Sequence, residues 1–224
     1  MNKLFKTIGK IEFLRKRFLS FSIFLHNYSY SLIKKFLLKP GEPHPKLEIM
    51  DYHGFFCENI SKDETVIDIG CGDGGVAANL TSKAKKIIGI DKDEEKIRKA
   101  KEKYNYSNLL LISGDAINYD FSSLGVEKFD KIILSNVLEH IQNRIPFLKK
   151  LHKISDTILL RVPMLSRDWL TVYKKNNGYK YMLDPTHCVE YTVKDLKEEL
   201  ENSGWTINDY SLNFGEFWGI VKKK

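Results

Sequence analysis

The sequence has little of what marks a secreted or membrane-spanning protein. Its 224 residues contain three cysteines, Cys57, Cys71 and Cys188, an odd number without metal-site spacing. This excludes a disulfide framework and favours a reducing compartment, so we expect a cytoplasmic protein. The apolar stretch at residues 18–25 is too short to cross a bilayer and has no small-residue cleavage site after it. We therefore expect neither a membrane span nor a signal peptide, and no internal repeat is visible.

Surplus charge is missing from most of the chain. The 36 Lys/Arg and 29 Asp/Glu residues give a formal net charge of +7. Residues 1–39 hold nine of the basic residues and one acid, Glu12, a net of +8, so the remaining 185 residues sum to −1. A nucleic-acid-binding domain carries positive charge on its folded surface, so we expect no nucleic acid partner. An apolar content of 42% excludes general disorder, and the length suits one large domain with an appendage.

A basic amphipathic helical arm is predicted over residues 1–40. Its apolar side chains recur at steps of three, four or seven residues, as on one face of a helix. The proline-rich run at residues 39–45 breaks the helix and marks a linker to a domain at 46–224. Three interpretations of the arm stay open: docking on the domain or over its active site, peripheral contact of residues 1–39 with an anionic membrane surface, or a dimer contact. The apolar positions are Leu4, Ile8, Ile11, Phe18, Phe21, Leu25, Tyr28, Leu32 and Phe36.

From residue 46 onwards, apolar strands alternate with helices. Continuous apolar strands separated by helices indicate a parallel sheet that is covered on both faces. The predicted strands lie at residues 66–69, 86–90, 109–112, 131–135 and 157–162, and the predicted helices at 46–60, 74–83, 93–103 and near 143–153.

Two further strands are predicted near the C-terminus. Thr192 and Asp195 have the spacing of a capping box, which opens a helix that ends near Ser203. Residues 205–210 and 216–221 follow as strands, and the loop between them is too short for a crossover helix. The predicted fold class is therefore α/β, with a mostly parallel sheet and an antiparallel last pair.

Residues 66–75 read VIDIGCGDGG and end in four glycines within six residues. Glycines between a strand and a helix let backbone N–H groups approach a ligand closely. Residues 70–75 have the spacing of dinucleotide-binding loops, and residues 68–74 have the Asp-x-Gly-x-Gly-x-Gly spacing of S-adenosylmethionine (SAM) enzymes. Asp68 suits the cationic methionine part of SAM and suits a pyrophosphate poorly.

Acidic residues also end the second and third predicted strands. Asp91 follows Asp68 by 23 residues, and its carboxylate can accept both hydroxyls of a ribose in NAD or SAM. Asp115, followed by Ala116, can accept the amino group of an adenine, and dehydrogenases do not generally need a carboxylate there. In register with the other two acids, Asp115 favours SAM.

The fourth predicted strand ends in SNVLEH at residues 135–140, and the motifs together resemble those of class I SAM-dependent methyltransferases. The resemblance covers residues 47–221. It implies a Rossmann-like seven-stranded sheet with an antiparallel last strand, SAM as the cofactor and S-adenosylhomocysteine as the product.

The resemblance also implies a cofactor-binding set at the ends of the first four strands. Within it, the glycine loop would hold the methionine end, Asp91 the ribose and Asp115 the adenine, and the residues after the fourth strand would lie beside the reacting methyl group. The set comprises Asp68, Gly70, Cys71, Gly72, Gly74, Asp91, Lys92, Asp115, Ala116, Asn136 and Val137.

Two histidines are the predicted catalytic residues. Methyl transfer to a hydroxyl needs alignment with the S–CH₃ bond and benefits from a general base. His140 is the leading candidate because a free imidazole titrates near neutral pH, and packing of the following helix is its alternative role. His187 lies in the loop after the fifth strand, where a hydrogen-bonding role is expected. With Glu139 these histidines resemble small-RNA ribose 2′-O-methyltransferases and ubiquinone-pathway O-methyltransferases, some of which use a divalent metal. Because Asn136 stands where the RNA enzymes have another glutamate, we predict no metal.

The acceptor is expected to meet residues 161–181, a long connection rich in Arg, Lys, Tyr and Trp. Aromatic faces with charged partners suit sugars, and a basic rim suits a phosphorylated or nucleotide-linked acceptor. Packing of this insert onto the sheet is the alternative. The predicted acceptor-binding residues are Arg161, Arg167, Trp169, Tyr173 and Tyr181.

The overall pattern resembles methyltransferases of surface-polysaccharide biosynthesis, which implies O-methylation of a small molecule or a glycan. One alternative is a nucleic-acid methyltransferase, which the near-neutral domain disfavours. Residues 135–138 also lack the Asn/Asp-Pro-Pro-Tyr/Phe motif of amino-group DNA methylation. The other alternative is a membrane-docked, non-catalytic SAM-binding module, which Asp68, Asp91 and Asp115 disfavour. Asp68 and Asp115 also disfavour a dehydrogenase.

Overall fold

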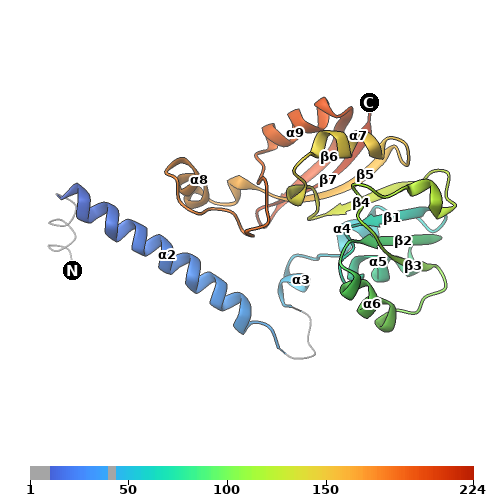
Figure 1. Cartoon of the computed structure of the whole chain (residues 1–224), viewed down its shortest axis with the longest axis horizontal. Coiled ribbons are helices and arrows are strands. Elements are labelled where there is room, and N and C mark those ends of the chain that lie inside the picture. The colour runs from blue at the N-terminus through green and yellow to red at the C-terminus, as the bar shows by residue number, and fades with distance from the viewer. Residues whose placement is uncertain (1–10, 40–43) are drawn as a thin grey trace. The chain divides into compact units, whose positions relative to one another are not determined.

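The computed structural model describes residues 11–39 and 44–224 and separates into two units, Met1–Tyr52 and His53–Lys224 (Figure 1). In the first unit, one helix, α2 (Glu12–Phe36), covers 25 residues, and the short helix α3 (Lys46–Ile49) follows the linker. Most large apolar side chains of α2 are exposed. Among the described residues, no helix combines the length and apolarity needed to cross a bilayer. The arm positions Leu4 and Ile8 and the linker residues 40–43 lie outside the described residues.

The second unit is built on a seven-stranded sheet with the order β3-β2-β1-β4-β5-β7-β6. Neighbouring strands among the first five are parallel, and β7 is antiparallel to both β5 and β6. The predicted mostly parallel sheet with an antiparallel last pair is confirmed. The strands are β1 (Thr65–Ile69), β2 (Lys86–Asp91), β3 (Leu109–Ser113), β4 (Lys131–Ser135), β5 (Thr157–Pro163), β6 (Trp205–Asn213) and β7 (Glu216–Lys223).

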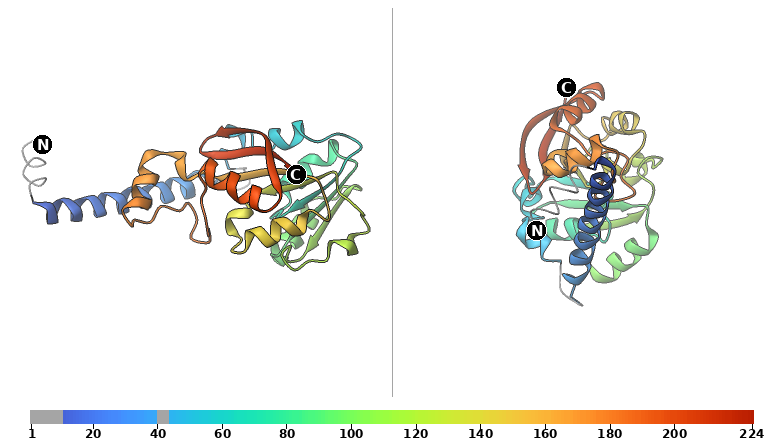
Figure 2. Two further views of the ribbon diagram at one scale, coloured as in Figure 1. Left: turned by 90° about the horizontal axis from the view of Figure 1, so that it is seen from above. Right: turned by 90° about the vertical axis from the view of Figure 1, so that its left-hand side faces the viewer.

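Helices cover both faces of this sheet (Figure 1, Figure 2). Because parallel crossovers are right-handed, the connections that run outward to β2 and β3 and those that run the other way to β5 and β6 place their helices on opposite faces. The helices of the unit are α4 (Gly54–Glu58), α5 (Gly75–Asn79), α6 (Glu94–Lys103), α7 (Arg144–Leu151), α8 (Trp169–Asn176) and α9 (Val193–Asn202), with 3-10 turns η1 (Leu80–Ser82), η2 (Phe121–Leu124), η3 (Leu138–His140) and η4 (Leu165–Arg167).

The main apolar core joins the sheet to α7 and α9. Buried side chains such as Ile67 and Ile158 pack in one cluster with Leu148 and Leu196 from the two helices. Trp205, at the start of β6, is fully buried in this cluster and donates its indole N–H to the carbonyl of Leu148 at 3.0 Å. The core therefore fixes β6, and through it the antiparallel end of the sheet.

The helix expected at residues 46–60 is broken into α3 and α4. Asp51 adopts a left-handed backbone conformation with φ of 44°, which interrupts the helical hydrogen bonds. Gly54 follows at the start of α4. The apolar periodicity of this segment is helical on both sides of the break, so the pattern alone could not reveal the turn.

The order of the strands creates the position of a site. From β1 the chain runs outward to β2 and β3 and then returns to β4, which pairs with β1 on its other side. In such sheets the connections diverge at this switch point and leave a crevice at the carboxyl ends of the strands. The glycine loop follows β1, and the SNVLEH segment continues from β4, so both lie at this edge.

The capping box at the start of α9 predicts a measurable stability effect. The Thr192 hydroxyl accepts the Asp195 N–H at 3.1 Å, and the Asp195 carboxylate accepts the Thr192 N–H at 3.4 Å. We expect Thr192→Ala to lower the free energy of unfolding by about 1 kcal/mol, because a backbone donor loses its partner. Thr192→Ser keeps the hydroxyl and should match the wild type in urea denaturation. Equal destabilisation by both substitutions would contradict the capping role.

Candidate active site

The glycine loop after β1 depends on left-handed backbone at three positions. Gly70, Gly72 and Gly74 have φ of 73°, 57° and 75°, a region that other residues enter only with strain. A Cβ on Gly70 would also lie 2.5 Å from a methyl of Val137, whereas one on Gly72 would meet nothing within 4 Å. The loop thus needs glycine for its shape and leaves open space beside Gly72.

Asp68 is a buried carboxyl group beside this loop. It lies on β1, is 1% exposed, and its Oδ2 atom has no hydrogen-bond partner among the described residues. Burial, reinforced by the charge of Asp91, raises the pKa of Asp68 to about 7. A buried polar atom without a partner costs about 1–3 kcal/mol, so such an atom at a sheet edge fits a ligand contact.

Asp91 connects the second strand to the glycine loop. One carboxylate oxygen accepts the Gly72 N–H at 2.8 Å, and the other accepts the Asp93 N–H at 2.9 Å. These bonds fix the carboxylate at the end of β2, and each oxygen keeps a lone pair for a ribose hydroxyl. The Gly72 N–H is committed to Asp91, so the loop offers shape here and not a free donor.

The predicted adenine end is held by a residue that the sequence did not single out. The Asp115 carboxylate accepts the Ile117 N–H at 3.1 Å and the side-chain amide of Asn118 at 2.8 Å, which closes a turn. Lys150 of α7 donates to the carbonyls of Ala116 at 3.2 Å and Ile117 at 2.9 Å, and also to that of Tyr119. Lys150 belongs to an ordinary Lys-Lys pair of a helix, and only the fold brings it to this loop.

Two predicted cofactor-binding residues, Cys71 and Lys92, differ in the burial of their side chains. The Cys71 side chain packs in a small apolar cluster with Ile97, Ala100 and Leu111, so a contact of Cys71 with the cofactor would come from its backbone and stays a prediction. The physical reason is that the loop turns this side chain into the layer between the sheet and α6. Lys92 is exposed after β2, where its ammonium group faces solvent.

The segment after β4 carries three buried oxygens that lack partners. Asn136 has a left-handed backbone with φ of 55°, and its Oδ1 atom is buried. Glu139, in η3, is 0% exposed, and neither carboxylate oxygen has a hydrogen-bond partner within the described chain. Burial raises the pKa of Glu139 to about 7. Backbone strain and unpaired buried oxygens concentrate where a ligand binds.

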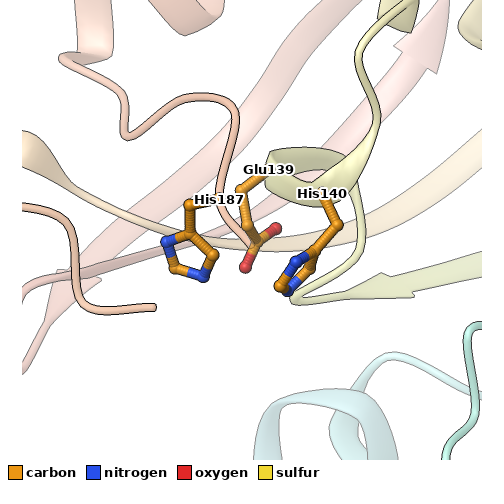
Figure 3. Close-up of side chains that lie close together, drawn as sticks. All are labelled: Glu139, His140 and His187. Atoms are coloured by element: carbon orange, nitrogen blue, oxygen red, sulfur yellow. The ribbon is translucent and has the colours of Figure 1, made fainter. Parts of the chain in front are cut away.

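The two predicted catalytic histidines lie together beside Glu139 (Figure 3). Their ring centroids are 4.8 Å apart in an edge-to-face arrangement. One ligand atom from each of Glu139, His140 and His187 lies within 4.8 Å of the other two. The structure therefore brings together residues from η3 and from the loop after α8, which are far apart in the sequence.

Hydrogen bonds determine the tautomer of each imidazole. The Thr186 hydroxyl donates to Asp184 at 2.6 Å, so at 2.9 Å from His140 it accepts the proton of Nδ1. The Nδ1–H of His187 donates to the Glu190 carboxylate at 3.1 Å. Both rings then keep Nε2 as a basic nitrogen. Burial and the neighbouring His187 lower the pKa of His140, which keeps its imidazole neutral near pH 7.

Glu190, which the sequence did not identify, organises the loop that carries His187. Besides His187, it accepts the Leu183 N–H and pairs with the Arg167 guanidinium. Burial acts to raise the pKa of Glu190, but the hydrogen bonds from His187 and Arg167 lower it below its usual range. Glu190 is therefore a carboxylate that orients His187.

Two predicted acceptor-binding arginines have internal roles instead. Arg161 is 0% exposed, pairs with the buried Glu216 and lies over the Trp218 ring at 4.6 Å. Arg167 donates to Glu190 and to the carbonyls of Met164 and Tyr181. The prediction that these guanidinium groups form a basic rim is wrong, because each satisfies a carboxylate that the fold buries.

The aromatic residues of the same insert remain candidates for acceptor contact. Trp169, at the start of α8, is 77% exposed, and Tyr173 and Tyr181 are partly buried. Tyr173 stacks on Tyr179 with centroids 6.5 Å apart. Lys175 lies over the Tyr181 ring at 6.0 Å. Part of this insert therefore packs on itself, while the Trp169 side chain stays exposed.

The sequence matches the methyltransferase domain over residues 42–209. This chain belongs to that family. The match includes the glycine loop, the acids that end β2 and follow β3, and the histidine pair. The methyltransferase assignment and SAM as the cofactor are confirmed at the level of the family.

Curated relatives share the domain and differ in their substrates. The ribosomal RNA small subunit methyltransferase A of Mycoplasma capricolum is 32% identical over 141 residues, which cover 61% of this chain and 52% of the relative. A probable (S)-tetrahydroprotoberberine N-methyltransferase of Papaver bracteatum is 32% identical over 106 residues, or 44% of this chain and 28% of the relative. The chain thus spans about half of the first relative and about a quarter of the second.

Solved structures show the same fold. A TehB-like SAM-dependent methyltransferase of Corynebacterium glutamicum is similar with a TM-score of 0.59 at 16% identity, covering 89% of this chain and 99% of that one. The magnesium protoporphyrin IX methyltransferase of Synechocystis, with bound S-adenosylhomocysteine, gives a TM-score of 0.59 at 18% identity, covering 79% and 81%. The resemblance to polysaccharide-modifying enzymes stays a prediction.

Asp68 predicts a pH dependence of cofactor affinity. Its pKa of about 7 in the folded chain exceeds the ordinary value of 3.8, so between these values the folded state holds a proton that the unfolded state lacks. This group's contribution to stability therefore falls as the pH rises through that window. The cationic methionine end of SAM favours the carboxylate, so its affinity should rise about tenfold from about pH 6 to about pH 8.

Calorimetric titration of SAM into the wild type and Asp68→Asn measures this effect. Asn removes the titrating proton and keeps the size of the side chain, so the variant should bind more weakly and lose most of the pH slope. A slope in the variant as steep as that of the wild type would show that another group causes it.

Proposed function

We propose that this protein transfers a methyl group from SAM to a hydroxyl of a small molecule or a glycan. One observation carries the proposal: buried oxygens without partners in Asp68, Asn136 and Glu139 lie at the carboxyl ends of β1 and β4, together with a pair of adjacent histidines. Buried polar groups are usually hydrogen-bonded, so these oxygens fit a site at which a ligand supplies the missing partners.

The residues present fit the cofactor. Bound SAM would supply an electrophilic methyl group on a sulfonium. The chain then needs to hold the cofactor, align the acceptor hydroxyl with the S–CH₃ bond and remove the proton of that hydroxyl. Asp68 suits the positively charged methionine end, and Asp91 has lone pairs directed from the end of β2 for the ribose. The open space at Gly72 admits a close approach of ligand to backbone.

His140 and His187 are the candidates for proton removal from the acceptor. Each ring holds its Nδ1 proton in a hydrogen bond and leaves Nε2 free to accept a proton. A hydroxyl nucleophile loses its proton as it attacks, so a base at this place accelerates the step by about 10²–10⁴. The Asp184 and Glu190 carboxylates stabilise the imidazolium that then forms.

Charge and surface chemistry support a small or sugar-like acceptor. Residues 40–224 sum to a net charge of −1, which gives no general attraction for a nucleic acid backbone. Trp169 offers an exposed aromatic face, a surface on which sugar rings stack. The relative that methylates ribosomal RNA makes RNA the competing acceptor.

An acceptor screen tests the proposal directly. Sugars, nucleotide sugars, small phenols and alcohols, and RNA are offered with SAM, and release of S-adenosylhomocysteine is measured. Turnover of a hydroxyl compound or glycan supports the proposal, and turnover of RNA alone would replace it. Cofactor binding without turnover of any class would favour a non-catalytic binding module.

The histidine pair predicts a loss of turnover without loss of cofactor affinity. With an active acceptor, His140→Gln should lower kcat by about 10²–10⁴ and leave the dissociation constant of SAM unchanged, because the ring would act on the acceptor. His26→Gln is the matched control, since His26 is an exposed histidine of α2 outside the domain. An unchanged kcat in His140→Gln would limit His140 to packing.

A metal-assisted form of the same reaction is a second candidate, and the donor set favours it. Glu139 and the two histidines form a two-histidine, one-carboxylate group with donor atoms within 4.8 Å of one another. Such a set suits Zn²⁺, Mn²⁺ or Fe²⁺. His187 donates to a carboxylate and His140 to a hydroxyl that is itself bound to one, as the histidine ligands of metal sites commonly do.

Metal titration separates the two candidates. If the group is a metal site, the wild type binds Zn²⁺ or Mn²⁺ by calorimetry after treatment with a chelator, and Glu139→Gln weakens binding at least tenfold, because an amide is a poor ligand. Glu64→Gln, which removes a partly buried carboxylate paired with Lys131, is the matched control. Absence of binding in the wild type would leave the histidines as metal-free bases.

A further inference from the structure

We propose that α2 lies on an anionic lipid surface and docks the protein to it through one apolar face. This inference concerns a segment outside the methyltransferase domain and does not rest on its activity. The face, here called the arm stripe, consists of side chains at steps of three or four residues, which an α-helix places on one side. The arm stripe comprises Leu14, Phe18, Phe21, Leu25, Tyr28, Leu32 and Phe36.

The arm stripe is apolar, aromatic and open to solvent. Phe18, Phe21 and Tyr28 are 52%, 58% and 55% exposed. Within the arm stripe, Leu32 alone is partly buried. A contiguous apolar row of this length needs a cover, because water contact of large apolar side chains is unfavourable. Phenylalanine and tyrosine beside basic residues are typical of helices that lie at a lipid headgroup boundary.

The charge of α2 indicates which kind of surface can bind the arm stripe. The described part of the arm carries Arg15, Lys16, Arg17, Lys34, Lys35 and Lys39, all exposed, against a single acid. That acid, Glu12, is already held by Arg15 at 2.8 Å and Lys16 at 3.4 Å. The arm therefore presents surplus positive charge at both of its ends, which an anionic surface complements.

A second copy of the arm fits this charge poorly. A parallel pair would place the basic cluster at residues 15–17 against the same cluster of the partner. An antiparallel pair centred on Leu25 would place it against Lys34 and Lys35. Both arrangements bring like charges together, and the single acid of the described helix cannot offset them. An anionic membrane is the occupant that satisfies both the apolar face and the basic ends.

Flotation of the full-length protein with lipid vesicles tests the proposal. We expect binding to vesicles that contain phosphatidylglycerol, little binding to phosphatidylcholine alone, and release by high salt, since salt screens the attraction. The triple variant Arg15→Gln, Lys16→Gln and Arg17→Gln should partition about 100-fold less, from about fivefold per basic residue near the surface.

Two tyrosines provide a matched pair for the face. Tyr28 lies in the arm stripe and Tyr30 nearly opposite to it, and their exposures of 55% and 53% are almost equal. Tyr28→Ser should weaken vesicle binding about tenfold, because a large apolar side chain no longer enters the lipid. Tyr30→Ser should bind as the wild type does. SAM titration in every variant checks that the domain is folded.

Several results would overturn the proposal. No flotation with anionic vesicles would remove it, and equal flotation with neutral vesicles would show that charge plays no part. Equal effects of Tyr28→Ser and Tyr30→Ser would exclude the arm stripe as the lipid-facing side. A dimer that sediments as such and is dispersed by Tyr28→Ser, without flotation, would assign the face to a second copy.

Discussion

The structure depends on keeping two carboxyl groups out of water at the carboxyl ends of the central strands β1 and β4. Asp68 and Glu139 are almost fully buried, and burial raises the pKa of each to about 7. Isolated groups of this kind destabilise a fold. The apolar strands and the core with α7 and α9 must offset that cost, and the edge then holds two carboxyl groups whose protonation responds to a cation. The same desolvation that weakens the fold makes the edge reactive.

Chains of hydrogen bonds, rather than the strands themselves, orient the rings of His140 and His187. Asp184 fixes the Thr186 hydroxyl, and Thr186 fixes His140, while Glu190 fixes His187. Arg167 anchors Glu190 to the insert. These bonds occupy the Nδ1 atom of each ring and direct each Nε2 atom away from them. A proton-accepting base and a metal ligand need the same unprotonated nitrogen, so this geometry serves both candidates, and metal binding distinguishes them.

Local features of the sequence were sufficient for the strands, the glycine loop and the capping box, because each depends on neighbours within a few residues. Long-range partners were not predictable. An arginine has the same appearance in a sequence whether it faces solvent or, like Arg161, meets an acid 55 residues away. Lys150 and Glu190 were missed for the same reason, and the loop sequence does not show that the Cys71 side chain packs into an apolar cluster. The motif identified the site, but its supporting residues follow from the fold.

The distribution of charge along the chain also has a structural consequence. Residues 1–39 carry a net charge of +8, and the rest of the chain carries −1. The positive charge that attracts an anionic surface therefore lies on the arm and not on the domain that holds the site. Had the same basic residues been spread over the domain, they would raise the affinity for any polyanion and crowd a site that needs buried carboxyl groups near neutral pH. Positive charge close to Asp68 or Glu139 would lower their pKa values and remove that property. The segregation of charge therefore lets the domain keep its desolvated edge while the arm stripe and its basic ends meet an anionic partner.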